Sequence, residues 1–152
     1  MTERTSTLLN RKAHHDYFIM ESMEAGIALV GCEVKSIRLG KANLQDSFAR
    51  VENGEIFLYG MHVTPYAQGN RYNPDPTRKR KLLLKHSEIN FFSGKVKEKG
   101  LTLVPLKLYF KSGKVKIQLS VAKGKTHGDK REKLKEKEAQ RDIDRAFRRK
   151  NR

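Results

Sequence analysis

The sequence predicts a mainly β protein: an oligonucleotide-binding-type β-barrel of about six strands, with flanking helices and a basic C-terminal tail. Three observations lead to this prediction. Several short segments between residues 1 and 122 alternate apolar and polar residues with a period of two. Glycine-containing turn pairs separate the clearest of these segments. Residues 123–152 instead carry 13 Lys and Arg against 6 Asp and Glu, with few apolar residues.

The clearest element is a hairpin whose strands, 106–111 and 114–121, meet at Ser112-Gly113. Apolar residues alternate with polar ones in both strands, which predicts one buried and one solvated face. The solvated face carries several lysines, among them Lys114. The residues predicted to point toward the core are Leu106, Leu108, Phe110, Val115, Ile117, Leu119 and Val121.

Further strands complete the predicted barrel. Segments 48–52 and 55–59 lie on either side of Asn53-Gly54, a strong signal for a two-residue hairpin turn. Segments 17–20 and 27–30 are additional candidates, and a strand from Gly60 ends near Pro65. Because many short strands with short turns favour closure, we expect a closed or nearly closed barrel.

Three helices are predicted between these strands, at 8–14, at 33–39 and after Ser87. Ser87 is a suitable N-cap, the apolar residues that follow it have helical spacing, and Gly100 suits the position just past the C-terminus. Before this helix, residues 78–81 are four consecutive cations in a predicted loop at the edge of the core. An ordinary solvated loop and a phosphate contact both fit that cluster.

The net charge of +16 and the pI near 10.1 favour a polyanionic partner, nucleic acid above all. Binding to a membrane surface requires a helix with a continuous apolar face. In the tail, Leu134 and Ile143 are nine residues apart, on opposite sides of a helix, so we predict no such face and no membrane partner. We expect two parts: residues 1–122 as the barrel, and residues 123–152 as a tail that is disordered when free and helical on a polyanion.

The cysteine, the histidines and the Gly-Lys-Thr run do not indicate an enzyme, a metal site or a cofactor. Cys32 is the single cysteine, which agrees with a reducing, cytoplasmic location. Gly124-Lys125-Thr126 lacks the upstream glycine of a phosphate-binding loop, since Leu119 occupies that position. A small ribonuclease that uses His15 or His62 is the alternative from another class, and it predicts RNA cleavage.

A series of linked motifs resembles the SsrA-binding protein family (small protein B), in order and spacing, across about residues 10–131. The matching segments are 10–19 (NRKAHHDYFI), 24–27 (EAGI), 31–36 (GCEVKS), 40–44 (GKANL), 75–78 (DPTR), 80–84 (RKLLL), 103–107 (LVPLK), 122–125 (AKGK) and 129–131 (DKR).

This resemblance implies an oligonucleotide-binding-type barrel that binds transfer-messenger RNA and delivers it to stalled ribosomes for trans-translation. The barrel stands in for an anticodon arm, while the tail probes the empty messenger channel near the decoding centre. No covalent step is catalysed, and we expect a monomer when free. A general RNA-binding barrel protein is the nearer alternative; the linked motifs argue against it.

The same resemblance implies two sets of site residues. Those matching RNA-contact positions or motifs are His15, Glu24, Lys35, Lys41, Asn43, Leu83, Lys114 and Lys123. Those matching the junction at the decoding centre are Gly124, Lys125, His127, Asp129, Lys130 and Arg131. The chemistry of Glu24 and Glu33 allows two roles: a carboxylate can be an ion-pair partner, or it can accept hydrogen bonds from the amino groups of bases.

Overall fold

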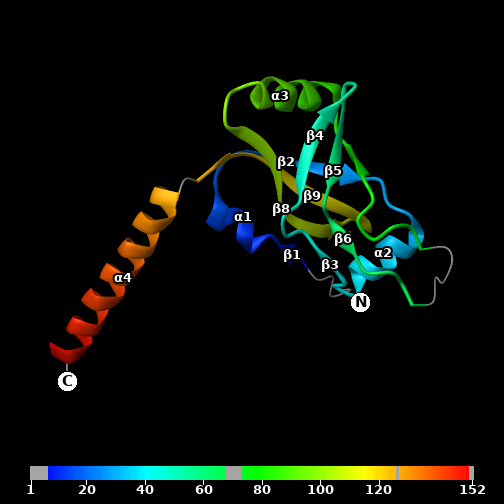
Figure 1. The fold of residues 1–152 in the computed structure, drawn as a ribbon. Coiled ribbons are helices and arrows are strands. Elements are labelled where there is room, and N and C mark those ends of the chain that lie inside the picture. The colour runs from blue at the N-terminus through cyan, green and yellow to red at the C-terminus, as the bar shows by residue number, and fades with distance from the viewer. Residues whose placement is uncertain (1–6, 68–72, 126, 151–152) are drawn as a thin grey trace.

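The computed structural model describes residues 7–67, 73–125 and 127–150 (Figure 1). Its elements in chain order are β1 (Leu8–Leu9), α1 (Arg11–Asp16), β2 (Tyr17–Ile27), α2 (Gly31–Arg38), β3 (Ala42–Asn43), β4 (Phe48–Glu52), β5 (Glu55–Tyr59), β6 (His62–Val63), β7 (Arg80–Leu83), α3 (His86–Val96), β8 (Leu101–Lys111), β9 (Lys114–Gly124) and α4 (His127–Lys150).

Six antiparallel strands close into a ring in the order β8-β4-β5-β7-β2-β9, and β9 pairs back onto β8. The short strand β1 adds to the outer edge of β8, and β3 pairs with β6 in a separate two-stranded sheet. The predicted fold class, mainly β with about six closing strands and flanking helices, is confirmed.

Both predicted hairpin turns are present. Asn53 and Gly54 have φ of 50° and 76°, and Ser112 and Gly113 have φ of 51° and 75°. Two consecutive residues with positive φ match the right-handed twist of the flanking strands, which is why these residue pairs are favoured there. The turns therefore set the register of β4 against β5 and of β8 against β9.

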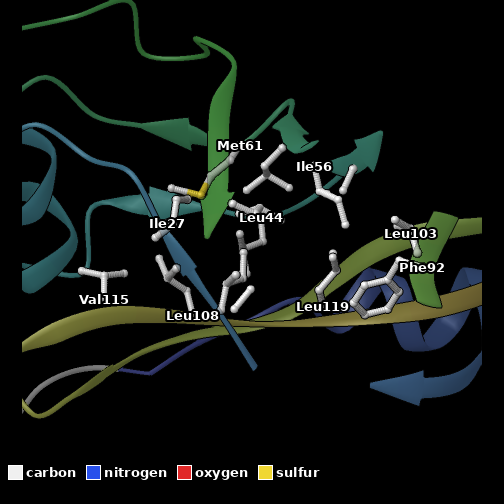
Figure 2. Close-up of a cluster of buried hydrophobic side chains, with 14 of the residues drawn as sticks. Ile27, Leu44, Ile56, Met61, Phe92, Leu103, Leu108, Val115 and Leu119 are labelled. Atoms are coloured by element: carbon white, nitrogen blue, oxygen red, sulfur yellow. The ribbon is translucent and has the colours of Figure 1, made fainter. Parts of the chain in front are cut away.

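The main core lies inside the ring, and Phe92 of α3 is packed against it (Figure 2). Val115, Ile117, Leu119 and Val121 are buried there, as predicted. Leu106 is different, because the register of β8 shifts between Pro105 and Lys107. Leu106 is buried, as predicted, but the shift turns it out of the main core and into a second cluster.

That second cluster lies beneath α1, where Ala13 packs with Val104, Leu106 and Ala122. The helix predicted at 8–14 begins only at Arg11, because Leu8 and Leu9 pair with β8. Asn10 separates the two elements: its side chain accepts from the Ala13 amide at 3.3 Å and donates to the Pro105 carbonyl at 2.8 Å.

Three other predicted boundaries were wrong. Segment 17–20 opens one long strand, β2, which has an irregularity between Ile19 and Ser22, and of segment 27–30 only Ile27 is in a strand, as the last residue of β2. The helix after β7 starts at His86 with Lys85 as its N-cap, so Ser87 lies inside it, and it ends at Val96. Of the strand predicted from Gly60, only β6 forms.

Helix α4 extends away from the ring (Figure 1), and the side chains of residues 137–148 are exposed. Ile143 and Phe147 are four residues apart and 61% and 69% exposed, so they share one side of the helix with Ala139. The tail therefore carries a short apolar stripe, which the comparison of Leu134 with Ile143 alone overlooked.

Candidate nucleic-acid interface

The outer face of β7, β2, β9 and β8 gathers polar and charged residues from distant parts of the chain. Gly26 on β2 lies opposite both Leu83 on β7 and Lys116 on β9, and Lys116 lies opposite Tyr109 on β8. Because side chains alternate between the faces of a strand, this row and its neighbours form one continuous surface. We call it the β2–β9 face.

Glu24 sits within the β2–β9 face, with its side chain about one-third exposed. The Tyr109 hydroxyl donates to Glu24 Oε2 at 2.5 Å, and Lys111 Nζ lies 3.5 Å from Oε1. The hydrogen bond from Tyr109 is the main reason that the pKa of Glu24 lies below its ordinary value. Desolvation and the Glu24 carboxylate together raise the pKa of Tyr109 to about 12. Glu24 is thus held as a charged hydrogen-bond acceptor at neutral pH.

Leu83 is an apolar side chain that remains 51% exposed beside Glu24. The absence of a side chain on Gly26 makes room for it, since a Cβ placed on Gly26 would lie 3.1 Å from Leu83 Cβ. Both residues line an open groove of about 570 Å³. Cations also line this groove, at Lys81, Lys85 and Lys116. An acceptor, an apolar surface and cations together suit an unstacked base and its phosphates.

Lys114 is exposed at the start of β9, opposite Lys111 across the hairpin turn. On the same face, Lys107 Nζ lies 5.3 Å from the centroid of the Tyr109 ring. Like charges placed this close repel one another, and an anionic partner relieves that repulsion.

The other predicted contact residues fall into two further groups. Near α1, the exposed His15 pairs with Asp16 at 2.9 Å, and Lys123 on β9 lies opposite Phe18. Lys125 Nζ donates to the His14 carbonyl at 3.2 Å and lies 5.1 Å from the Phe18 ring centroid. Gly124 pairs with Tyr17, so the junction is attached to the ring.

The second group lies around α2 and β3. Lys35 Nζ is 5.4 Å from the centroid of the Tyr66 ring, and Lys41 is exposed. Asn43 accepts from the Gln45 amide at 2.8 Å, so part of its role is to shape a turn. The structure therefore does not bring all the predicted contact residues to one site.

Four junction residues, His127, Asp129, Lys130 and Arg131, belong to the first turns of α4. Their side chains lie outside the described part of the structure.

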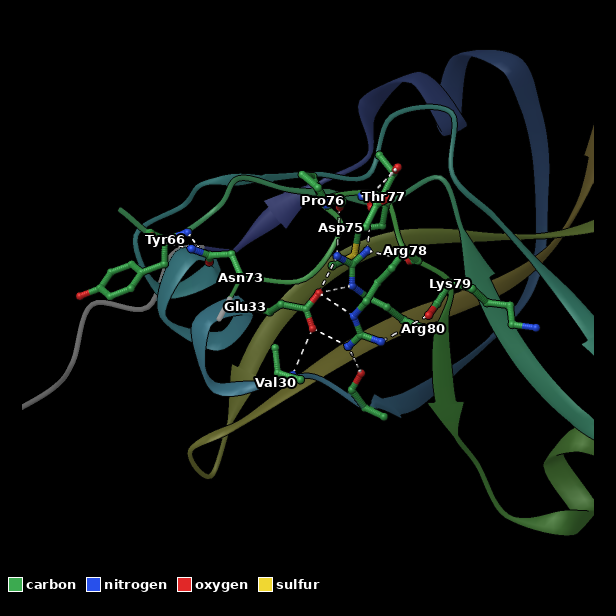
Figure 3. Close-up of polar contacts among 12 residues, drawn as sticks. Val30, Glu33, Tyr66, Asn73, Asp75, Pro76, Thr77, Arg78, Lys79 and Arg80 are labelled. Atoms are coloured by element: carbon green, nitrogen blue, oxygen red, sulfur yellow. Dashed lines mark hydrogen bonds and ion pairs between the residues drawn. The ribbon is translucent and has the colours of Figure 1, made fainter. Parts of the chain in front are cut away.

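The cluster at residues 78–81, predicted as a loop, is partly strand β7, and its cations face carboxylates. Figure 3 shows the Glu33 carboxylate against Arg78 and Arg80. Arg80 is fully buried and Arg78 partly so, and both contact Glu33, at 2.6 and 2.5 Å. Lys79 pairs with Glu52 at 3.1 Å and Lys81 with Glu55 at 2.7 Å. Arg78 and Arg80 thus hold the fold together, and Glu33 is their ion-pair partner.

Sequence reasoning missed several members of the β2–β9 face as site residues: Tyr109, Lys111, Lys116, Lys81 and Lys85. The alternation within 106–111 and 114–121 does place Tyr109, Lys111 and Lys116 on the solvated side. That signal shows that a side chain faces solvent, but not that it faces Glu24, 85 positions earlier in the case of Tyr109.

Within residues 7–67, 73–125 and 127–150, no helix is both long and apolar enough to cross a membrane. Across the same ranges, no three His, Cys, Asp or Glu side chains cluster as a metal site would require.

Comparison with known proteins gives concordant matches. The model of the SmpB protein family matches residues 7–149. The SsrA-binding protein of Geobacillus kaustophilus (strain HTA426) is 64% identical over 139 residues, which are 91% of this chain and 90% of the relative. The SsrA-binding protein of Bacillus subtilis (strain 168) is 61% identical over 139 residues, 91% and 89% of the two chains. A solved structure of tmRNA-SmpB, described as a journey to the center of the bacterial ribosome, aligns with a TM-score of 0.69 and 51% identity, covering 84% of this chain and 94% of the other.

Proposed function

The chain belongs to the SmpB protein family, and from this membership we propose that it binds transfer-messenger RNA (SsrA RNA) and delivers it to stalled ribosomes for trans-translation. The observation that carries the proposal is the match to SsrA-binding proteins at more than 60% identity over nine-tenths of the chain. The solved tmRNA-SmpB structure supports the ribosome as the second partner.

We assign RNA recognition to the β2–β9 face. Glu24 is a charged acceptor suited to the amino groups of a base, and Leu83 offers an apolar surface for its ring. Lys114 and Lys116 are exposed or half-exposed cations suited to the neighbouring phosphates. His15, Lys35, Lys41, Asn43 and Lys123 are additional contacts in this proposal.

We assign the ribosome contacts to the tail. Residues 124–131 lie against the decoding centre, and the rest of the tail occupies the empty messenger channel, while the ring takes the place of an anticodon arm. In this proposal residues 123–152 are disordered in the free protein and become helical on the ribosome, because few apolar groups stabilise them alone.

We propose no catalytic step. The protein acts as an adaptor in the cytoplasm, where ribosomes translate, and the single Cys32 agrees with that compartment. The ribonuclease alternative predicts RNA cleavage that His15→Ala or His62→Ala abolishes, and the adaptor predicts an intact RNA.

The test is a binding titration of the protein with transfer-messenger RNA and with an ordinary transfer RNA, each at two salt concentrations. We expect tighter binding of transfer-messenger RNA and a preference that survives the higher salt, because recognition then extends beyond phosphate neutralisation. Equal affinities that weaken equally with salt would mean a general polyanion binder and would falsify the proposal.

Leu83→Ala supplies the site-specific arm of this titration. Loss of a surface that packs on a base is expected to weaken binding of transfer-messenger RNA by about tenfold and to leave transfer RNA unchanged. The matched control is Ile143→Ala, an apolar side chain 61% exposed on α4, which this proposal assigns to the ribosome.

A further inference from the structure

A second set of aromatic and cationic side chains lies on the hairpin of β4 and β5. Figure 1 shows where this hairpin lies in the ring. In the ring order β8-β4-β5-β7-β2-β9, β4 lies across from β2 and β5 lies across from β9. Ala49, Ile56 and Leu58 point into the core, so the residues that alternate with them point outward. This outward surface, the β4–β5 face, adjoins the β2–β9 face along β7 and β8, but its centre lies on the opposite side of the ring from β2 and β9.

The centre of the β4–β5 face is a stack of two rings. Phe48 and Tyr59 are direct cross-strand partners, their centroids are 5.6 Å apart, and their planes differ by 12°. Phe48 is the more accessible ring, 37% exposed. Two nearly parallel rings can accept a third planar ring on their open side, and every nucleobase presents such a ring.

Two cations accompany these rings. The Arg50 guanidinium carbon lies 5.8 Å from the Phe48 centroid. Lys79 Nζ lies 4.4 Å from the Phe57 centroid and 5.9 Å from that of Tyr59. Because Arg50 lies over the Phe48 ring, a base that stacks on this ring takes the place of the guanidinium. The exposed Arg50 side chain is then free to meet the phosphate of that base.

The carboxylates of this face are already engaged. Glu52 accepts from Lys79 and from the Tyr59 hydroxyl, and Glu55 pairs with Lys81. Among the described residues no carboxylate lies within ion-pair distance of Arg50, whose side chain is exposed. The charge left for a partner is positive.

Two hollows flank this edge of β4 and share Thr102 of β8 as a lining residue. One, of about 180 Å³, lies beside Phe48; its Lys12 is paired with Asp46 at 2.6 Å, and Asp16 also lines it. The other, of about 430 Å³, includes Arg50. They leave room along the edge of β4 for the sugar and phosphate on each side of a stacked base.

We propose that the β4–β5 face is a second RNA-contact site, which binds an unpaired nucleobase on the Phe48–Tyr59 stack while Arg50 holds the adjacent phosphate. An unpaired base is required because the faces of bases in a duplex are covered by their neighbours. RNA fits better than a protein partner because the uncompensated charge on the face and on the whole molecule is positive. The site is additional to the β2–β9 face.

The test is an NMR titration of the full-length, ¹⁵N-labelled protein with three probes: a short single-stranded RNA, a duplex of the same length, and inorganic polyphosphate. We expect the single strand to shift the amide signals of residues 48–59, and the duplex and polyphosphate to leave them nearly unchanged. Phe48→Leu keeps an apolar side chain but removes the ring, so the affinity read from these signals is expected to fall about tenfold.

Two control variants make the outcome specific. Tyr59→Phe retains the stacked ring and is expected to keep the shifts, while Leu83→Ala on the other face leaves them intact. Both variants and Phe48→Leu must retain the dispersed spectrum of the folded protein. Unshifted signals at 48–59, as expected if a protein partner uses this face, would overturn the proposal, as would polyphosphate reproducing the shifts. Because the probe is a generic oligonucleotide, failure to prefer transfer-messenger RNA leaves this test unaffected.

Discussion

Arg80 is a fully buried cation, and Glu33 is the residue that balances its charge. Arg80 Nε donates to Glu33 Oε2 at 2.7 Å, and its other nitrogens donate to the Met61 and Pro76 carbonyls at 2.7 and 3.0 Å. Burial lowers the pKa of Arg80 and tends to raise that of Glu33. Hydrogen bonds to Glu33 from Arg78, the Val30 amide and Arg80 outweigh its burial, so the pKa of Glu33 lies below its ordinary value.

Glu33→Gln is expected to lower the free energy of unfolding at pH 7 by about 3–5 kcal/mol, because it leaves the buried Arg80 charge without a counter-ion. Urea unfolding followed by circular dichroism measures this change. Glu55→Gln is the matched control: its partner Lys81 is 44% exposed, and such a pair contributes about 1 kcal/mol or less. Equal losses in the two variants would contradict this account of Arg80.

The same pair predicts a pH dependence of stability. Since the pKa of Glu33 is lower in the folded than in the unfolded protein, its stabilising contribution is complete above about pH 4.5 and is lost as the pH falls through the folded value. Thermal melting at a series of acidic pH values should show a steeper loss for the parent protein than for Glu33→Gln. Parallel curves would assign the acid sensitivity to other carboxylates.

In the proposed function, Tyr109 supports RNA binding by holding the Glu24 carboxylate in place. Tyr109→Phe removes the hydroxyl that donates to Glu24, so the pKa of Glu24 is expected to rise toward its ordinary value, as measured by NMR titration of the carboxyl carbon. Binding of transfer-messenger RNA should weaken several-fold, because the carboxylate is no longer held in place. Tyr59→Phe removes an equivalent hydroxyl bond to Glu52 on the opposite side and is expected to leave that binding unchanged.

Helix α4 differs from the strands of the ring in the exposure of its side chains. The side chains of residues 137–148 are exposed, whereas each strand of the ring buries residues in the core. Its high content of Glu, Lys, Arg and Ala favours a helix locally, but local preference alone gives only marginal stability. A partner is therefore needed to stabilise it, and the ribosome fills this role in the proposed function.

Deleting residues 132–152 is expected to preserve the preference for transfer-messenger RNA over transfer RNA. It is also expected to abolish trans-translation, and with it the tag that this process adds to the stalled product. The ring that carries Glu24 and Leu83 stays complete, and the segment assigned to the messenger channel is lost. Binding titration measures the first effect, and the yield of tagged product on a truncated message in a reconstituted translation system measures the second. If the shortened protein no longer binds the RNA, the division between ring and tail is wrong.

Across the molecule, the closed ring provides two solvated faces that point in different directions, and the positive charge extends over both ring and tail. Residues 123–152 contribute +7 and residues 1–122 contribute +9 of the total of +16. Non-specific attraction to RNA is thus expected of the whole chain, while the proposed function assigns selectivity to the β2–β9 face.

This distribution predicts the salt dependence of binding to an ordinary transfer RNA. Residues 132–152 contain nine Lys and Arg against five Asp and Glu, a net charge of +4. Their deletion should make the slope of log affinity against log salt shallower, because fewer counterions are released. An unchanged slope would show that the tail does not contact transfer RNA.

Local patterns were enough to predict the parts of the fold that depend on neighbours in sequence. A two-residue turn between twisted strands requires positive φ, and residue pairs such as Asn53-Gly54 and Ser112-Gly113 adopt it readily. Both hairpins were therefore predictable. The period of two likewise identified the buried residues of β9. The order and spacing of the short motifs indicated the family, because this comparison needs only the sequence and not the contacts between distant residues.

Contacts between distant residues depended on how the ring closes. From the sequence alone, Arg80 is one of four consecutive cations, and nothing nearby in the sequence indicates that it is buried. Its burial depends on Glu33, which is 47 positions away and packs against it. Leu106 follows the alternation of its strand, and one shift of register in β8 turns it to the other side. Tyr109 meets Glu24 only because β8, β9 and β2 pair in a specific register, whereas the local Asn53-Gly54 turn already places Phe48 opposite Tyr59. Turn chemistry and alternation act over a few residues, whereas burial and charge pairing depend on which elements become neighbours in space.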